Sequence, residues 1–198
     1  PRISYHESMQ KYGTDKPDLR FGLELFDFSD LFVGTEFRVF DSILNDGGII
    51  KGFVAPGMAS YARRQLDELN EFVKARGASG MIYVSLKGDS LESMKSEDIT
   101  SPIARFLSSE VVQEMAKRSG ANVGDSILII AGPIKSTNTA LSLLRNEIGI
   151  RLDLIDHDEI AFAFVTEFPL FEWDEDGNRW EPMHHAFTMP QNLDSVDL

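Results

Sequence analysis

The sequence predicts an α+β fold, in which helices pack on one face of a mixed or antiparallel sheet. Segments rich in β-formers alternate with amphipathic segments, and the first two expected strands follow one another directly, which favours an antiparallel start. With 198 residues, 42% of them hydrophobic, the chain can bury a sizeable core.

The first expected element is a short helix over residues 4–11. Ser4 suits its N-cap and Glu7, three positions later, completes a capping box. Gly13 ends the helix. Residues 13–20 mix Gly, Asp, Lys and Pro, so we expect an ordered loop there rather than a regular element.

A β-hairpin and a helix are expected next. Residues 36–40 alternate polar and apolar side chains, residues 49–54 are rich in β-formers, and residues 45–48 supply turn residues between them. Residues 61–76 then form an amphipathic helix, because their apolar positions recur at three- and four-residue spacing: Leu66, Leu69, Phe72 and Val73.

The middle of the chain supplies the central strand. Residues 81–84 predict a strand that runs into a long polar loop. Ser101 and Pro102 have the form of an N-cap and first helical residue, so a helix over 101–107 is expected, followed by a second over 109–119. Residues 126–131 are continuously apolar, which is typical of a strand buried on both faces.

The C-terminal third predicts one more helix and a change of structural body. Residues 137–148 have helical spacing, and residues 160–168 form a strongly apolar strand that suits a large sheet elsewhere. We therefore expect a second body to begin near residue 156.

Composition excludes several classes of protein. A net charge of −13 argues against a general nucleic-acid-binding surface, which needs clustered Lys and Arg. The absence of cysteine excludes disulfides and thiolate metal sites and fits a reducing compartment, so the cytoplasm is expected. No run reaches 18 apolar residues, and no membrane association is expected. Because the chain opens with Pro1, we expect it to begin mid-protein.

Residues 132–137 follow a buried strand and open a helix, as a phosphate-binding loop does. The pattern fails, because Ile134 and Ile129 stand where a Walker A motif needs glycines. We expect a strand-to-helix turn with Ser136 or Thr137 as the N-cap.

Residues 172–177 imitate the first half of a calcium loop, but Met183 stands where a bidentate Glu is needed. A hairpin is favoured instead, with Trp173 and Trp180 on its strands and residues 176–178 at its turn.

Three further groups of polar residues are candidates for a binding site. Neighbours on a strand point to opposite faces, so His184 and His185 are a poor metal site, and no metal site is predicted. Lys16 and Arg20 could meet an anion, but a solvated loop with capping Asp15 or Asp18 is favoured. The remaining group is the basic flank of the 61–76 helix, formed by Arg63, Arg64, Lys74 and Arg76. Acidic neighbours on the same helix indicate that this flank is a solvated face.

Two segments resemble one enzyme family. Residues 168–173 and 183–188 (FPLFEW and MHHAFT) resemble the histidine loop of bacterial-type aspartyl-tRNA synthetases, and residues 12–20 (YGTDKPDLR) resemble an earlier stretch of it. Departures from the family pattern are Thr14, Glu167 and Ala186. The resemblance implies catalytic-domain segments at 1–23 and 156–198, flanking an inserted GAD domain at 24–155 with a two-layer fold.

The resemblance also implies a function. Such enzymes activate aspartate with ATP and Mg²⁺, transfer it to tRNA and act as homodimers. It implies that His184 and His185 bind aspartate; His184 is the preferred contact, although the residues themselves do not decide between the two. No residue of the chain is predicted to be catalytic, because nothing resembles class II motifs 2 and 3 or the anticodon-binding barrel. We expect a fragment that is inactive by itself and needs no cofactor.

Two other functions remain open. A freestanding GAD-type module could bind tRNA or a protein partner. A metal-dependent hydrolase could use the two histidines with residues 174–176, although we expect no metal binding. If the flanks belong to a larger catalytic domain, the strand over residues 160–165 should leave an apolar patch exposed; in a complete module both ends should pack.

Overall fold

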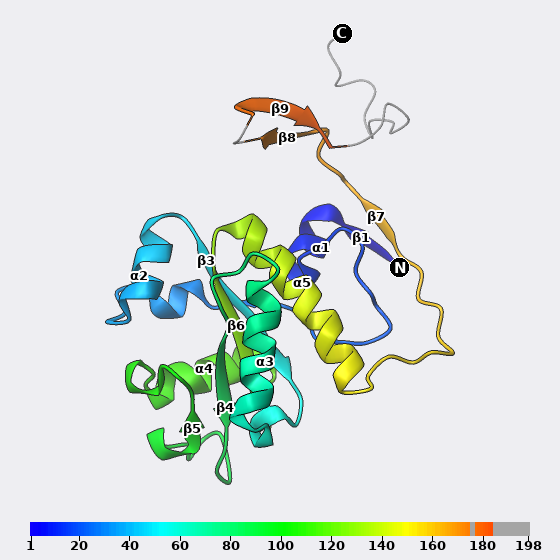
Figure 1. Cartoon of the computed structure of the whole chain (residues 1–198). Helices are drawn as coiled ribbons and strands as arrows, with labels where there is room; N and C mark the ends of the chain where they lie inside the picture. Colours follow the sequence, from blue (N-terminus) through cyan, green and yellow to red (C-terminus); the bar gives the residue numbers. More distant parts are fainter. Residues whose placement is uncertain (175–176, 184–198) are drawn as a thin grey trace.

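A computed structural model describes residues 1–174 and 177–183. Its largest sheet has five strands in the order β2-β3-β6-β4-β5, and each neighbouring pair is antiparallel (Figure 1). The strands are β2 (Phe26–Asp27), β3 (Ile49–Ala55), β4 (Ile82–Leu86), β5 (Ile99–Thr100) and β6 (Ser126–Gly132). The predicted α+β fold with an antiparallel sheet is confirmed.

Helices cover both faces of this sheet, so the expectation of helices on one face is wrong. Ile127 and Ile129 of β6 pack in one buried cluster with residues of α2 (Arg38–Asn45) and α4 (Ser109–Ser119). The next positions, Leu128 and Ile130, pack in a second cluster with α3 (Arg63–Lys74) and α5 (Ile134–Arg151). Since β6 is apolar at successive positions, both of its faces need cover.

The first helix confirms its predicted caps. α1 spans Tyr5–Tyr12, and the Ser4 hydroxyl accepts a hydrogen bond from the Glu7 N–H at 3.1 Å. Gly13 ends the helix in the left-handed region at φ 70°, and its N–H donates to the Met9 carbonyl. Its backbone lies against α5, so a Cβ at Gly13 would overlap the Asn138 carbonyl oxygen. Only glycine fits this junction.

The predicted strand over residues 36–40 is wrong, because α2 occupies Arg38–Asn45. Phe40 is buried against Phe32, with ring centroids 4.9 Å apart, and Phe37 also contacts it. Alternation over five residues concealed the helical spacing that a longer window would show. The Gly48 N–H donates to the Ile43 carbonyl at 2.8 Å, so the glycine pair ends a helix rather than turning a hairpin.

Two other helix starts differ from prediction. Residues 101–107 contain only a short 3₁₀ turn, η4 (Ala104–Phe106), rather than an α-helix. α5 begins at Ile134 with Pro133 as its N-cap, so Ser136 and Thr137 lie inside its first turn. The fixed φ of proline suits a helix start, and the helix therefore begins earlier than the hydroxyl residues indicated. The remaining 3₁₀ turns are η1 (Ser29–Phe32), η2 (Met58–Ser60) and η3 (Ser96–Asp98).

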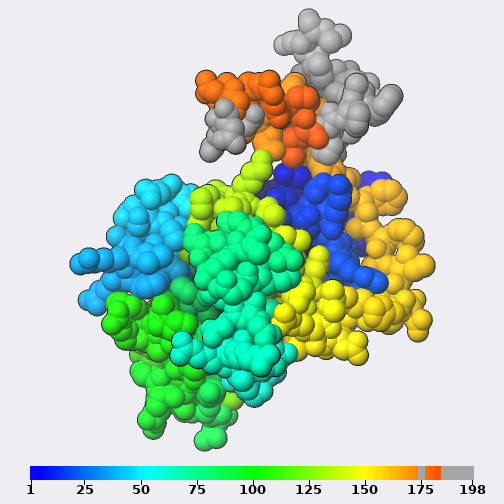
Figure 2. Space-filling model, viewed as in Figure 1, coloured from blue at the N-terminus to red at the C-terminus, as the bar shows by residue number. Residues whose placement is uncertain are grey.

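The segments that precede and follow the five-stranded sheet meet in a separate parallel pair of strands. β1 (Arg2–Ser4) pairs with β7 (Phe164–Thr166), and the Cα partner of Ile3 is Val165. β7 covers only part of the strand predicted for residues 160–168. Beyond it, β8 (Phe171–Asp174) and β9 (Arg179–Pro182) form the predicted hairpin, which stands above α1 and the start of α5 (Figure 2). In the described part of the chain, no helix is both long and apolar enough to cross a lipid bilayer.

Replacing Gly13 by alanine should strongly destabilise the protein. The new side chain adds left-handed strain and a clash with α5, so we expect a loss of about 3 kcal/mol or more in the free energy of unfolding by urea. Gly34→Ala is the matched control, because Gly34 has φ 73° but nothing within 4 Å of an added Cβ. It should cost about 1–2 kcal/mol. Equal losses in both variants would contradict the packing argument.

Candidate functional site

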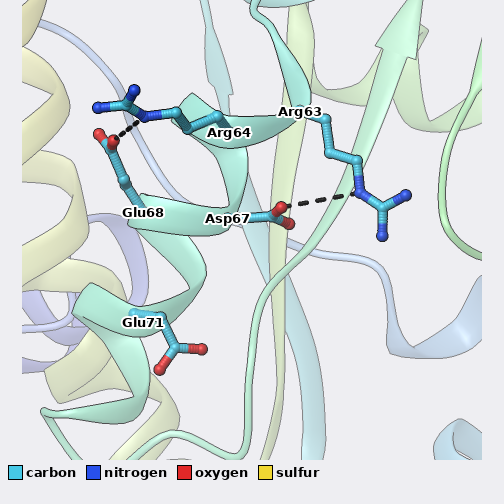
Figure 3. Close-up of a pocket in the computed structure, with 5 residues that line it drawn as sticks. All are labelled: Arg63, Arg64, Asp67, Glu68 and Glu71. Carbon is cyan, nitrogen blue, oxygen red and sulfur yellow. Dashed lines mark hydrogen bonds and ion pairs between the residues drawn. The ribbon is translucent and has the colours of Figure 1, made fainter.

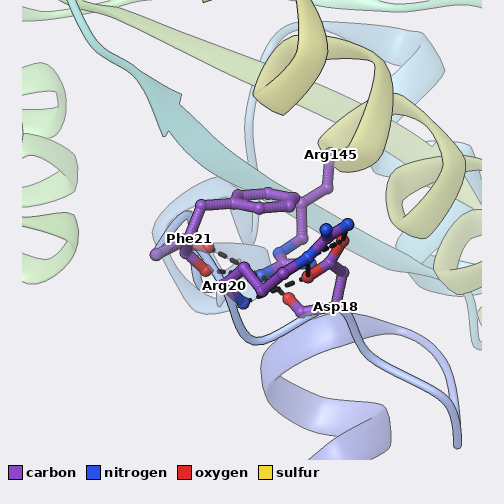
Figure 4. A network of polar contacts seen from close by, with 5 residues as sticks. Asp18, Arg20, Phe21 and Arg145 are labelled. Atoms are coloured by element: carbon purple, nitrogen blue, oxygen red, sulfur yellow. Dashed lines mark hydrogen bonds and ion pairs between the residues drawn. The ribbon is translucent and has the colours of Figure 1, made fainter. Parts of the chain in front are cut away.

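A buried arginine ties the N-terminal segment to the sheet domain. Arg145 of α5 is 1% exposed. Its Nε donates to the Leu23 carbonyl at 3.0 Å, and its Nη2 donates to three more carbonyls in the same loop, those of Asp18, Phe21 and Gly22 (Figure 4). The guanidinium also lies 4.2 Å from the centroid of the Phe21 ring. Burial lowers the pKa of Arg145.

The loop held by Arg145 has its own internal ion pair. The Asp18 carboxylate accepts hydrogen bonds from the Arg20 backbone N–H at 3.0 Å and from Arg20 Nη2 at 2.7 Å. Arg20 holds the pKa of Asp18 below its usual range. Thr14 Oγ1 accepts from the Lys16 backbone N–H. The prediction of a loop fixed by a capping carboxylate is therefore confirmed for Asp18.

A buried lysine forms a second tie. Lys51 of β3 is 5% exposed, and its Nζ donates to the Met9 carbonyl at 3.1 Å and to Asn138 Oδ1 at 2.9 Å. The sheet, α1 and α5 thus meet at one ammonium group. Burial lowers the pKa of Lys51 to about 8, and Asp27 opposes the shift.

A cleft of about 960 Å³ opens beside this tie. Glu172 and Trp173 of the hairpin line one side of it. The other side is lined by residues of α1, of the end of α2 and the turn after it, and of the end of β6 and the start of α5: Tyr5 and Met9; Ile43, Asp46, Gly47 and Gly48; Gly132, Pro133, Ile134, Lys135 and Asn138. One wall is therefore the helix and sheet domain and the other is the β8–β9 hairpin. Lys135 Nζ lies 2.9 Å from Glu172 Oε1 and spans the two walls.

β8 and β9 confirm the hairpin predicted with Trp173 and Trp180 on its strands. Trp173 pairs with Trp180 across the strands, and their ring centroids are 5.4 Å apart. The Met183 N–H donates to the Leu170 carbonyl at 3.0 Å, which closes the base of the hairpin. Within residues 1–174 and 177–183, no group of three or more His, Asp or Glu side chains could hold a metal ion.

His184 and His185 lie outside the described residues, immediately after Met183. The predicted aspartate contacts therefore follow β9 directly in sequence.

The basic flank of α3 is neutralised by its own helix, as predicted. Arg63 lies 3.7 Å from Asp67 and Arg64 lies 3.1 Å from Glu68, each four residues on (Figure 3). These exposed pairs leave no strongly basic surface on this stretch of α3.

A model of the GAD domain matches residues 40–141 of the chain. That stretch runs from within α2 to the start of α5 and includes α3, α4 and strands β3 to β6. The chain belongs to the GAD domain family. The GAD domain expected from the sequence is thus confirmed.

Curated relatives match both the GAD domain and its flanks. Aspartate–tRNA(Asp/Asn) ligase of Dehalococcoides mccartyi (strain CBDB1) is 45% identical over 98% of this chain and 33% of the relative. The ligases of that name from Geotalea uraniireducens and Moorella thermoacetica are each 42% identical over 98% of this chain and 31% of the relative. The chain spans about a third of the length of these relatives, and the resemblance to aspartyl-tRNA synthetases is confirmed.

Sequence reasoning missed Arg145 and Lys51, although both left a signal. Arg145 is a lone charge on the buried face of α5, four residues after Leu141 and three before Ile148. Lys51 is a lone charge in an apolar strand. A single charge on a buried face indicates a hydrogen-bonded tie, because an unpaired buried cation is costly.

Replacing Arg145 by methionine should release the loop over residues 18–23. Four carbonyl groups would lose their donor, so we expect a loss of about 3–5 kcal/mol in the free energy of unfolding. Arg151→Met is the matched control, since Arg151 belongs to the same helix and, within the described residues, forms an ion pair only with the partly exposed Glu147. It should cost about 1 kcal/mol or less. Comparable losses in the two variants would show that the hydrogen bonds from Arg145 to the 18–23 loop do not stabilise the protein.

Lys51 should make stability depend on pH. Between pH 8, its folded pKa, and 10.5, its ordinary value, the unfolded chain holds a proton that the folded chain has released. Stability from this group therefore rises with pH across that window, by at most about 3 kcal/mol. In Lys51→Met this contribution should vanish. Urea unfolding of both proteins from pH 7.5 to 9.5 measures the difference, and parallel curves would contradict it.

Proposed function

We propose that the chain is a section of an aspartate–tRNA ligase, in which a GAD domain at 24–155 is inserted between catalytic-domain segments at 1–23 and 156–198. The observation that carries this proposal is the parallel pairing of β1 with β7. An inserted domain must leave the host segments on its two sides close together, and this pairing joins them in one small sheet.

An exposed apolar stripe supports a larger host. Ile160, Phe162 and Phe164 alternate along the chain and are 76%, 77% and 72% exposed. Several large apolar side chains that are exposed close together in sequence are typical of a surface that another part of the protein covers. A freestanding GAD-type module would pack both ends, so the stripe argues against that alternative. The net charge of −13 argues against tRNA binding as the main role of this section.

The proposed ligase activates aspartate with ATP and passes the aminoacyl group to tRNA, as a homodimer in the cytoplasm. Mg²⁺ would neutralise phosphate charge when bound. Within residues 1–174 and 177–183, the chain has no group of three or more potential metal ligands. The contribution of this section is to bind the amino acid through His184 and His185, which continue from the hairpin.

ATP–pyrophosphate exchange tests the proposal. The 198-residue chain should show no aspartate-dependent exchange, whereas a protein extended to the length of the relatives should. In that longer protein, His184→Ala should lower kcat/KM for aspartate about 10- to 100-fold, the value of one charge-assisted hydrogen bond. His185→Ala should have a smaller effect. Exchange by the short chain, or none by the long one, would overturn the proposal.

A further inference from the structure

Among the described residues, an aromatic contact and an ion pair connect the β8–β9 hairpin and its base to the rest of the molecule. It follows β7 and stands clear of the sheet domain in Figure 1. Near its base, the Tyr5 ring of α1 lies 5.2 Å from the Phe168 ring. On its cleft side, Glu172 meets Lys135 at 2.9 Å. An ion pair and an aromatic contact thus hold the hairpin over the cleft.

Lys135 is well placed to set the position of the hairpin. It lies in the first turn of α5. α5 is held in place by the hydrogen bond from Lys51 to Asn138 and by those from Arg145 to the 18–23 loop. Its partner Glu172 lies next to Trp173 on β8, and both line the cleft. The same charges act on Tyr5: after burial, Glu172 is the largest cause that raises its pKa, and Lys135 opposes it. Three groups from α1, α5 and β8 therefore share one electrostatic environment.

The geometry points to Lys135 as a positioning residue: through Glu172 it fixes the β8–β9 hairpin against the GAD domain, and so couples that domain to the segment that continues into His184 and His185. An effect of Lys135 on catalysis rests on the proposed ligase function. The docking of the hairpin does not rest on that function, because it concerns only the contact between α5 and β8. The Lys135 side chain is 82% exposed and the Glu172 side chain is 44% exposed, so the pair shifts a docking equilibrium without controlling folding.

The chain offers a built-in probe of this docking. Its only two tryptophans, Trp173 and Trp180, are both in the hairpin. In a Trp180→Phe background, Trp173 is the sole tryptophan; it is 42% exposed and lines the cleft. Undocking should therefore increase its quenching by acrylamide and shift its emission to longer wavelength.

In that background, Lys135→Met and Glu172→Gln should each raise the ratio of undocked to docked hairpin about two- to fivefold, the range that exposed ion pairs supply. Lys135→Arg should behave as the parent, and the double variant Lys135→Glu with Glu172→Lys should restore docking. At 1 M NaCl, where the Debye length is about 3 Å, the parent should approach Lys135→Met. Lys74→Met is the matched control, because Lys74 forms a 2.9 Å pair with Glu71 on α3.

Quenching that is unchanged in Lys135→Met, or a charge-reversed pair that is quenched like the single variants, would overturn the inference.

In a protein of the relatives' length, Lys135→Met should raise KM for aspartate more than it lowers kcat, and the charge-reversed pair should restore the parent KM. If that protein shows no aspartate-dependent exchange, the proposed function fails while the quenching result stands. If exchange is present but KM is unmoved, the coupling fails alone.

Discussion

The contact between the Arg145 guanidinium and the carbonyl groups of residues 18–23 organises the chain. A buried cation is costly unless its N–H groups find acceptors, and here backbone oxygens receive them. The Phe21 ring packs directly on Gly149, where a side chain would not fit. The N-terminal segment is thereby held on α5, in the position from which β1 can reach β7.

The shape of the cleft depends on these buried hydrogen bonds, which fix α1 and α5 relative to the sheet. Lys51 joins α1, β3 and α5 at one point, so one wall of the cleft is as rigid as the sheet domain. The opposite wall is the hairpin, held by an exposed ion pair and by the contact between Tyr5 and Phe168. Buried ties cost several kcal/mol to break and exposed pairs about 1 kcal/mol or less. The hairpin is thus the wall that is easier to displace.

Periodicity predicted the elements whose pattern is long or continuous. β6 was evident from an unbroken apolar run, and α3 and most of α5 from helical spacing. α2 was missed because five alternating residues imitate a strand. The partners of Arg145 and Lys51 could not be predicted, since they are backbone carbonyls and an amide distant in sequence. The role expected for His184 and His185 came from family resemblance, and the structure describes the hairpin that precedes them.

The parallel pairing of β1 with β7 has a topological consequence. Parallel strands cannot be joined by a tight turn and always need a long crossover connection. In this chain the whole GAD domain serves as that crossover. Because the entropy of closing a connection grows only slowly with its length, a host can accept an entire folded body where a single helix would suffice.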